Sequence, residues 1–157
     1  MIPGRRKILF HGSECEGTSA QTLDAYCREI AYAVVENGCS VLLSGPGALD
    51  LSVAEYARQA CEKNGRSPAE AVHWYFAGAA SEQTNAPDPR IGIGSRFYLR
   101  LKDNYGSFAR LRTCLVEKVD AVITVGGRKG VQDVIEKAML ARRPFFPVAV
   151  TGGASLD

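Results

Sequence analysis

Three glycine-bearing segments follow apolar runs of strand length, and their residue types suit them to bind a ligand. The segments contain Gly12-Ser13-Glu14, Ser44-Gly45-Pro46-Gly47 and Gly126-Gly127-Arg128-Lys129-Gly130. Glycine allows a phosphate or a sugar to approach the main chain closely. The helix N-terminus that follows such a loop offers free N–H groups and a partial positive charge. This chemistry predicts binding of an anionic, nucleotide-like molecule.

Neither standard phosphate-binding motif is present in these segments. The sequence has no G-x-x-x-x-G-K-[ST], and the segment from Gly12 to Gly17 lacks the G-x-G-x-x-G spacing. Kinase-like and ordinary dehydrogenase functions are therefore disfavoured. A single glycine loop also occurs as a simple tight turn, so the argument for binding depends on all three loops meeting at one edge of a sheet.

Cations accompany the third of these segments. Arg128 and Lys129 are expected at a helix N-terminus, where positive charge opposes the helix dipole unless an anion is bound. Arg112 precedes the same strand on a helix, where it either binds a phosphate or belongs to a solvated charged face. Both interpretations of Arg112 stay open at this stage.

Strand-length apolar runs alternate with segments of helical periodicity, which is typical of successive βαβ units. We expect strands at 7–12, 40–43, 72–77, 121–125 and 145–150, with a helix after each of the first two and before and after the fourth. The predicted fold is α/β, a Rossmann-like doubly wound sandwich of about five parallel strands with helices on both faces. The carboxyl ends of parallel strands share one edge, so the three glycine segments should meet there.

One connection is unusually long for a compact domain. About 28 residues follow the third expected strand, and they contain Arg90, Arg96 and Arg100. These cations would either close over a ligand as a lid or keep a long loop soluble.

Composition indicates one globular domain over residues 1–157. The chain is 46% hydrophobic and 23% charged, and its formal charge of +2 gives no general affinity for polyanions, so nucleic acid is not the expected partner. No apolar run is long enough to span a membrane and no signal peptide is recognisable, so we expect a cytoplasmic protein. Five unpaired cysteines and two histidines favour neither disulfides nor a metal site.

The segments that carry these features resemble the SLOG superfamily, and the resemblance covers nearly the whole chain. This superfamily includes the Lonely Guy phosphoribohydrolases, relatives of the DNA-processing protein, and sensor domains of bacterial antiphage systems such as Thoeris and CBASS. The matching segments are Phe10-His11-Gly12-Ser13, Val41–Gly47, Leu111-Arg112, Val119–Gly130 and Arg143–Val148. The resemblance implies that the last glycine loop cradles a nucleotide phosphate or ribose, with a nearby arginine such as Arg112 on the phosphate.

The chain departs from the catalytic motif of the Lonely Guy enzymes, P-G-G-x-G-T-x-x-E. Val125 replaces the proline, the loop has an extra residue, Val131 replaces the threonine, and Val134 stands where the glutamate is needed. Asp133 and Glu136 flank that position, but a shift of one or two residues turns a side chain by about 100–200° around a helix. We therefore expect no catalytic residue, and binding rather than hydrolysis.

The resemblance implies a sensor of a nucleotide-derived second messenger, either a cyclic ADP-ribose isomer or a cyclic oligonucleotide, as in antiphage defence. Occupancy would act through a homo-oligomer on a fused or associated effector domain, and no cofactor is expected besides the nucleotide ligand. Two alternatives are a Lonely Guy-like nucleoside monophosphate phosphoribohydrolase and a structural oligomerisation domain with a vestigial pocket. The chain stops soon after its last expected strand, so we also expect that it is part of a longer protein.

Overall fold

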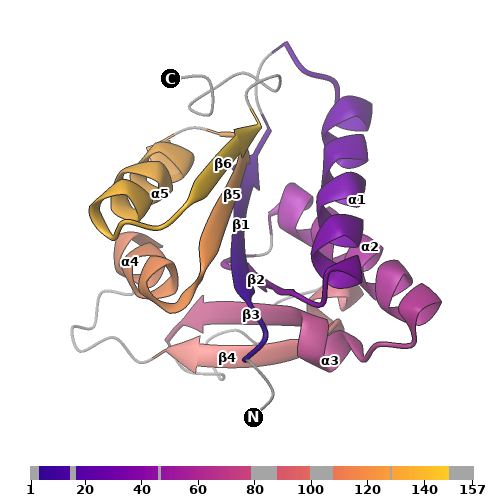
Figure 1. Ribbon diagram of the computed structural model, residues 1–157. Helices are drawn as coiled ribbons and strands as arrows, with labels where there is room; N and C mark the ends of the chain where they lie inside the picture. Colours follow the sequence, from indigo (N-terminus) through magenta and orange to yellow (C-terminus); the bar gives the residue numbers. More distant parts are fainter. Residues whose placement is uncertain are drawn as a thin grey trace.

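A parallel sheet of six strands forms the middle layer of the molecule, with helices on both of its faces (Figure 1). The computed structural model describes residues 4–14, 17–45, 47–78, 88–99, 108–127 and 129–148. The order of the strands is β4-β3-β2-β1-β5-β6, and every neighbouring pair is parallel. The Rossmann-like α/β fold class predicted from the sequence is confirmed.

The element bounds follow the βαβ plan. The strands are β1 (Lys7–Ser13), β2 (Ser40–Leu43), β3 (Val72–Ala77), β4 (Ser95–Leu99), β5 (Ala121–Gly126) and β6 (Phe145–Val148). The helices are α1 (Ala20–Glu36), α2 (Ala48–Asn64), α3 (Pro68–Ala71), α4 (Phe108–Lys118) and α5 (Lys129–Leu140), with the 3₁₀ helix η2 at Pro89–Gly92. None of the helices in the described parts of the chain is long and apolar enough to cross a membrane.

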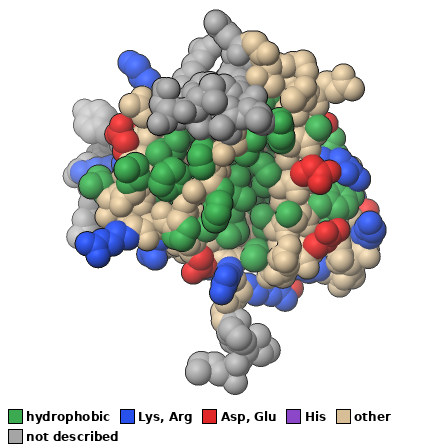
Figure 2. All heavy atoms as spheres, turned by 45° about the horizontal axis from the view of Figure 1, so that its top comes forward, with side chains coloured by type: hydrophobic (Ala, Val, Ile, Leu, Met, Phe, Trp, Pro, Cys, Tyr) green, Lys and Arg blue, Asp and Glu red, His purple; other side chains and the backbone are tan. Residues whose placement is uncertain are grey.

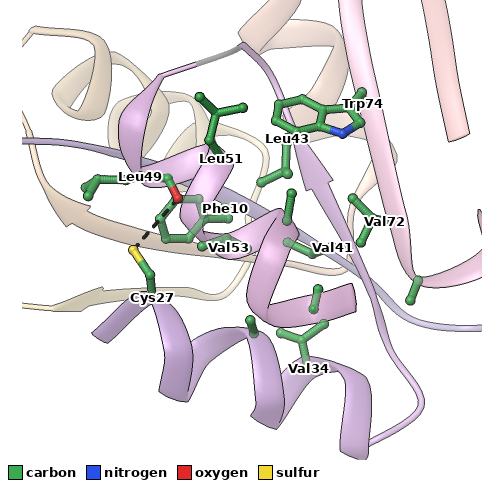
Figure 3. Packing of buried hydrophobic residues seen from close by; sticks show 14 of the residues in the cluster. Phe10, Cys27, Val34, Val41, Leu43, Leu49, Leu51, Val53, Val72 and Trp74 are labelled. Carbon is green, nitrogen blue, oxygen red and sulfur yellow. Dashed lines mark hydrogen bonds between the residues drawn. The ribbon is translucent and has the colours of Figure 1, made fainter. Parts of the chain in front are cut away.

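Helices α1 and α2 pack against one face of the sheet and against each other. Figure 3 shows side chains of β1, β2 and β3, among them Phe10 and Leu43, that point toward these helices. Cys27 of α1 lies in this cluster, fully buried, with its Sγ atom 3.8 Å from the carbonyl oxygen of Leu49. Cys27 thus packs as a small buried hydrophobe.

Helices α4 and α5 cover the opposite face. Leu9 and Leu42 point to this side, whereas their chain neighbours Phe10 and Leu43 point to the other. Successive side chains of a strand alternate between faces, so strands buried on both sides read as continuous apolar runs. Both layers therefore hold the carboxyl ends of the strands in fixed positions.

The sheet has six strands where about five were expected, because β4 lies inside the predicted long connection. Phe97 and Tyr98 of β4 stack on Tyr75 and Phe76 of β3, with ring centroids 4.9 and 5.6 Å apart. This aromatic ladder fixes β4 at the edge of the sheet.

The proposed lid of arginines is not a free loop where the structure describes it. Arg90 belongs to η2 and is held by the Asp88 carboxylate, 2.7 Å from its guanidinium, while Arg96 is part of β4. Arg100 lies outside the described residues.

Candidate ligand-binding site

The strand order places a topological switch point between β1 and β5. From β1 the chain proceeds through α1 on one face, and from β5 it proceeds through α5 on the other (Figure 1). His11 pairs with Thr124, and Gly12 pairs with Val125, at the carboxyl ends of these two strands. Open α/β sheets bind ligands in the crevice outside this kind of switch point.

A cavity of about 250 Å³ opens at this edge, and we call it the Arg112 cavity. It is lined by His11, Ser44, Gly45, Gly47, Asp50, Leu111 and Arg112. These residues come from β1, α4, α2 and the loop between β2 and α2. Segments far apart in the sequence therefore contribute to one site.

Arg112 is the cation of this cavity, and its guanidinium is held in place. Its Nε donates to Asp133 Oδ2 at 2.6 Å, and the same oxygen accepts from Lys137 Nζ at 2.7 Å. Burial acts to raise the pKa of Asp133, but the hydrogen bonds from Lys137 and Arg112 outweigh it and hold that pKa below its usual value. Asp133 is thus an ionised positioning residue for Arg112.

His11 lies beside Arg112 and is neutral. Its Nδ1 is 3.2 Å from Ser44 Oγ. Burial, and then the positive charge of Arg112, lower the pKa of His11 to about 4. A Cβ atom on Gly130 would lie 3.2 Å from His11 Nε2 and 3.6 Å from Arg112 Nη1, so the absence of a side chain at Gly130 keeps this corner of the site open.

Asp50 supplies a carboxyl group to the same cavity from the first turn of α2. It is only 6% exposed, and burial raises its pKa well above the usual value. Within the described parts of the chain, no hydrogen-bond partner reaches its Oδ1. Native proteins leave few such atoms unpaired, which makes Asp50 a notable feature of the site.

Two further cavities continue along the carboxyl edge. One, of about 340 Å³, is lined by Gly12, Ser13, Glu14, Gly47, Ala48 and Leu49. The next, of about 370 Å³, is lined by Glu14, Ala20, Gln21, Leu23, Asp24, Ala48, Leu49 and Ser52. Shared lining residues make the three cavities neighbours, with a cation at one end and carboxylates at the other.

Figure 2, which turns the upper edge of Figure 1 forward, shows hydrophobic side chains across the middle of this face and charged ones toward its borders.

The glycines of the β5–α5 loop have a structural role that the sequence reading did not include. Gly126 and Gly127 have φ angles of 55° and 93°. A Cβ on Gly127 would lie 1.9 Å from Cγ2 of Val131, so the fold itself requires glycine there. The predicted role of glycine in this loop, close approach of a ligand to the main chain, is therefore not the only reason for glycine at position 127.

The ten predicted site residues that the structure describes divide into three groups. Gly45, Gly47 and Arg112 line the Arg112 cavity, whereas Gly12, Ser13 and Glu14 line its neighbour. Gly126, Gly127, Lys129 and Gly130 belong to β5, its loop and the start of α5. Pro46 and Arg128 lie outside the described residues.

Two polar residues of the Arg112 cavity, His11 and Asp50, were not predicted as site residues, and Ser44 was included only as part of the second glycine segment. A polar residue within an apolar helical pattern was the available signal for Asp50. The described residues contain no group of His, Cys, Asp and Glu that could hold a metal ion.

Comparisons with known proteins identify relatives by fold. No family model and no curated protein matches the sequence. The crystal structure of the protein TM1055 matches with a TM-score of 0.72 at 19% identity, over 96% of this chain and 78% of that one. The molybdenum cofactor carrier protein MCP from Chlamydomonas reinhardtii matches with a TM-score of 0.61 at 13% identity, over 90% and 74%.

DNA processing protein A also has this fold. The Streptococcus pneumoniae protein gives a TM-score of 0.62 at 17% identity, and the match covers 90% of this chain and 50% of that one. The Helicobacter pylori protein, described with a single-stranded DNA binding mode, gives 0.61 at 14%, over 90% and 64%. These four solved structures share the α/β fold of the chain, so the Rossmann-like architecture expected from the sequence is confirmed.

Proposed function

We propose that this chain binds a nucleotide-derived small molecule whose phosphate lies in the Arg112 cavity. The observation that carries the proposal is the fixed position of the Arg112 guanidinium, which donates a hydrogen bond to Asp133 at the switch point of the sheet. A guanidinium fixed before the ligand arrives loses little side-chain entropy on binding phosphate. The start of α5 at Lys129 adds a helix N-terminus on the same edge.

The distribution of charge along the edge favours a small ligand over a nucleic acid strand. Arg112 lies at one end, whereas Glu14 and Asp24 line the cavities that continue from it. A polyanion following this edge would meet those carboxylates, but a nucleotide would place its sugar and base there. Some fold neighbours bind DNA, so single-stranded DNA is the necessary competing ligand in any test.

We further propose that binding serves sensing rather than catalysis. Val134, at the position of the Lonely Guy glutamate, is fully buried. Asp133 is engaged by Arg112 and Lys137, and Glu136 accepts from Gln132 on an exposed part of α5. Neither carboxylate lines a described cavity, which disfavours the hydrolase alternative.

The messenger we propose is a cyclic ADP-ribose isomer or a cyclic oligonucleotide, as in the sensor domains of antiphage systems, and the output is a change in oligomeric state that acts on an effector. Exposed apolar side chains support a contact between copies. Met139, Leu140 and Phe146 are 61%, 85% and 58% exposed on α5 and β6. Ligand would shift the oligomer only by binding one arrangement more tightly than the other.

A binding panel tests the proposal. Thermal unfolding and calorimetry would be measured with adenosine 5′-monophosphate, cyclic ADP-ribose, a cyclic dinucleotide and single-stranded DNA. We expect at least one nucleotide to stabilise the wild type, since a ligand at about 100 times its Kd adds about 2.7 kcal/mol. The effect should disappear in Arg112→Ala and persist in Arg110→Ala, which removes an exposed cation from the same helix.

Two results would overturn the proposal. One is a strong preference for DNA over every nucleotide, and the other is binding that survives in Arg112→Ala. Release of free base from adenosine 5′-monophosphate, followed by chromatography, would instead support the hydrolase. Light scattering with and without the best nucleotide tests the oligomer step, and identical mass in both states would exclude it.

A further inference from the structure

Asp50 carries a buried carboxyl group whose hydrogen bonding is incomplete. Its Oδ1 atom has no partner within the part of the chain that the structure describes, and the residue is 6% exposed. Buried polar atoms in native proteins are almost always paired, and an unpaired one lowers stability. A carboxyl oxygen at such a place is suited to accept a hydrogen bond from a bound molecule.

The position of Asp50 defines what that partner must be. Asp50 shares the lining of the Arg112 cavity with Arg112 itself. Arg112 nevertheless pairs with Asp133, and burial rather than a neighbouring charge controls the pKa of Asp50. The two groups therefore mark separate parts of one small cavity, one suited to an anion and the other to a hydrogen-bond donor.

We propose that Asp50 binds the ribose hydroxyl groups of the ligand whose phosphate lies on Arg112, an inference that rests on the proposed function. The unpaired Oδ1 atom can accept a hydrogen bond from a ribose hydroxyl, as acidic residues do in dinucleotide-binding sheets. The site would then select ribonucleotides over analogues that lack the sugar hydroxyls.

The size of the cavity favours the sugar over the base as the group that Asp50 recognises. Its volume of about 250 Å³ is below the roughly 300–1,000 Å³ of a pocket that encloses a whole drug-sized ligand. The sugar is the part of a nucleotide next to the phosphate, so it should share this cavity with the phosphate. The base would extend into the neighbouring cavity beyond Gly47. An amino group of the base is the other possible donor, and the experiment separates it.

Calorimetry on the full chain tests this role with four probes. Adenosine 5′-monophosphate has both donor types, inosine 5′-monophosphate lacks the amino group, 2′,3′-dideoxyadenosine 5′-monophosphate lacks the hydroxyls, and inorganic phosphate lacks both. The proteins are the wild type, Asp50→Asn, Asp50→Ala and the control Glu29→Gln, which changes an exposed carboxylate on α1. Asp50→Asn keeps the shape of the side chain, and Asp50→Ala removes both side-chain oxygens.

We expect the wild type to bind the adenosine and inosine nucleotides about 10- to 100-fold more tightly than the dideoxy analogue. Asp50→Asn and Asp50→Ala should lose that preference while inorganic phosphate binds as in the wild type, and Glu29→Gln should retain the preference. Equal affinity of the wild type for adenosine and dideoxyadenosine nucleotides would overturn the role of Asp50. So would a preference for the hydroxyl-bearing nucleotides that persists in both Asp50 variants. Weaker binding of the inosine than of the adenosine nucleotide would show that the amino group of the base is the donor, and it would overturn the role as well. If the wild type binds neither nucleotide nor phosphate, the proposed function fails as well.

Discussion

The Nδ1 atom of His11 lies 3.2 Å from the Oγ atom of Ser44, and this contact joins the ends of β1 and β2 at the carboxyl edge of the sheet. Both residues face the Arg112 cavity. The ring is partly buried and stands close to the charge of Arg112, so it stays neutral at physiological pH. A protonated imidazole at this place would be repelled by the charge of Arg112 and would add a second desolvated charge.

The stability of the protein should therefore decrease as the pH falls from about 6.5 to about 4. The folded-state pKa of His11 is lowered to about 4, so over this window the unfolded chain binds a proton that the folded chain does not. We expect this group to contribute about 3 kcal/mol of stability at pH 7 that is lost by pH 4. Urea unfolding of the wild type and of His11→Gln across this range measures it, and a difference that does not change with pH would contradict the assignment.

Asp50→Asn should stabilise the protein in the absence of ligand. The pKa of Asp50 is raised in the folded state, so its favourable contribution is present below the unfolded value near 3.8 and is lost as the pH rises through the folded value. The advantage of the asparagine variant should therefore increase from pH 4 upward, to about 1–3 kcal/mol. Chemical unfolding at several pH values checks this, and a variant less stable than the wild type at pH 7 would show that the carboxylate has a partner.

Gly130→Ala and Gly127→Ala should separate a binding effect from a folding effect. Alanine at Gly130 gains helix propensity of about 1 kcal/mol but introduces a Cβ 3.2 Å from His11 Nε2, so stability should change little while nucleotide binding weakens. Alanine at Gly127 meets Val131 and a φ of 93°, so it should lower stability by about 2 kcal/mol or more. Thermal unfolding and calorimetry on both variants distinguish the two cases. Equal stability losses would mean that Gly130 is also structural.

Lys129→Ala should have opposite effects on the free and the bound protein. Lys129 is exposed at the first position of α5, where a positive charge opposes the helix dipole, so its removal should stabilise the free protein by about 0.3–1 kcal/mol. Loss of a charge-assisted contact to phosphate should weaken binding by about 1.5–3 kcal/mol.

Salt and a matched variant provide the controls for Lys129. Affinity for the nucleotide should fall with added salt in the wild type, and by less in Lys129→Ala. Lys118→Ala removes a lysine from the far end of α4 and should change neither affinity nor its salt dependence. Wild-type affinity that is independent of salt would argue against a phosphate contact at this exposed position.

Local sequence patterns predicted most of the fold but not its edge. The runs around Leu9 and Leu42 are apolar on both faces, so they identify buried parallel strands without further information. The sequence around β4 mixes polar and apolar residues, with Arg96 between glycines and aromatic side chains. The strand is stabilised by stacking of its aromatic rings on those of β3. Such cross-strand contacts are not visible in the sequence of one segment, so the strand was missed.

The candidate site, like the fold, could be predicted from the sequence only in part. Gly45, Gly47 and Arg112 could be predicted because a glycine loop or a cation can be recognised as suited to bind a ligand from the residue types of one segment. His11 and Ser44 are 33 residues apart and meet only because β1 and β2 are adjacent in the sheet. Burial of Asp50 likewise depends on how α2 packs, which periodicity alone does not determine.

The side chain of Lys137 connects α5 to α4. Its ammonium group donates both to Asp133 on its own helix and to the carbonyl oxygen of Ala109 on α4, each at 2.7 Å. With the Arg112–Asp133 pair, this places two contacts between α4 and α5 about one helical turn apart. Arg112, at the cavity, is thereby connected to the helix whose opposite end carries the exposed side chains of Met139 and Leu140.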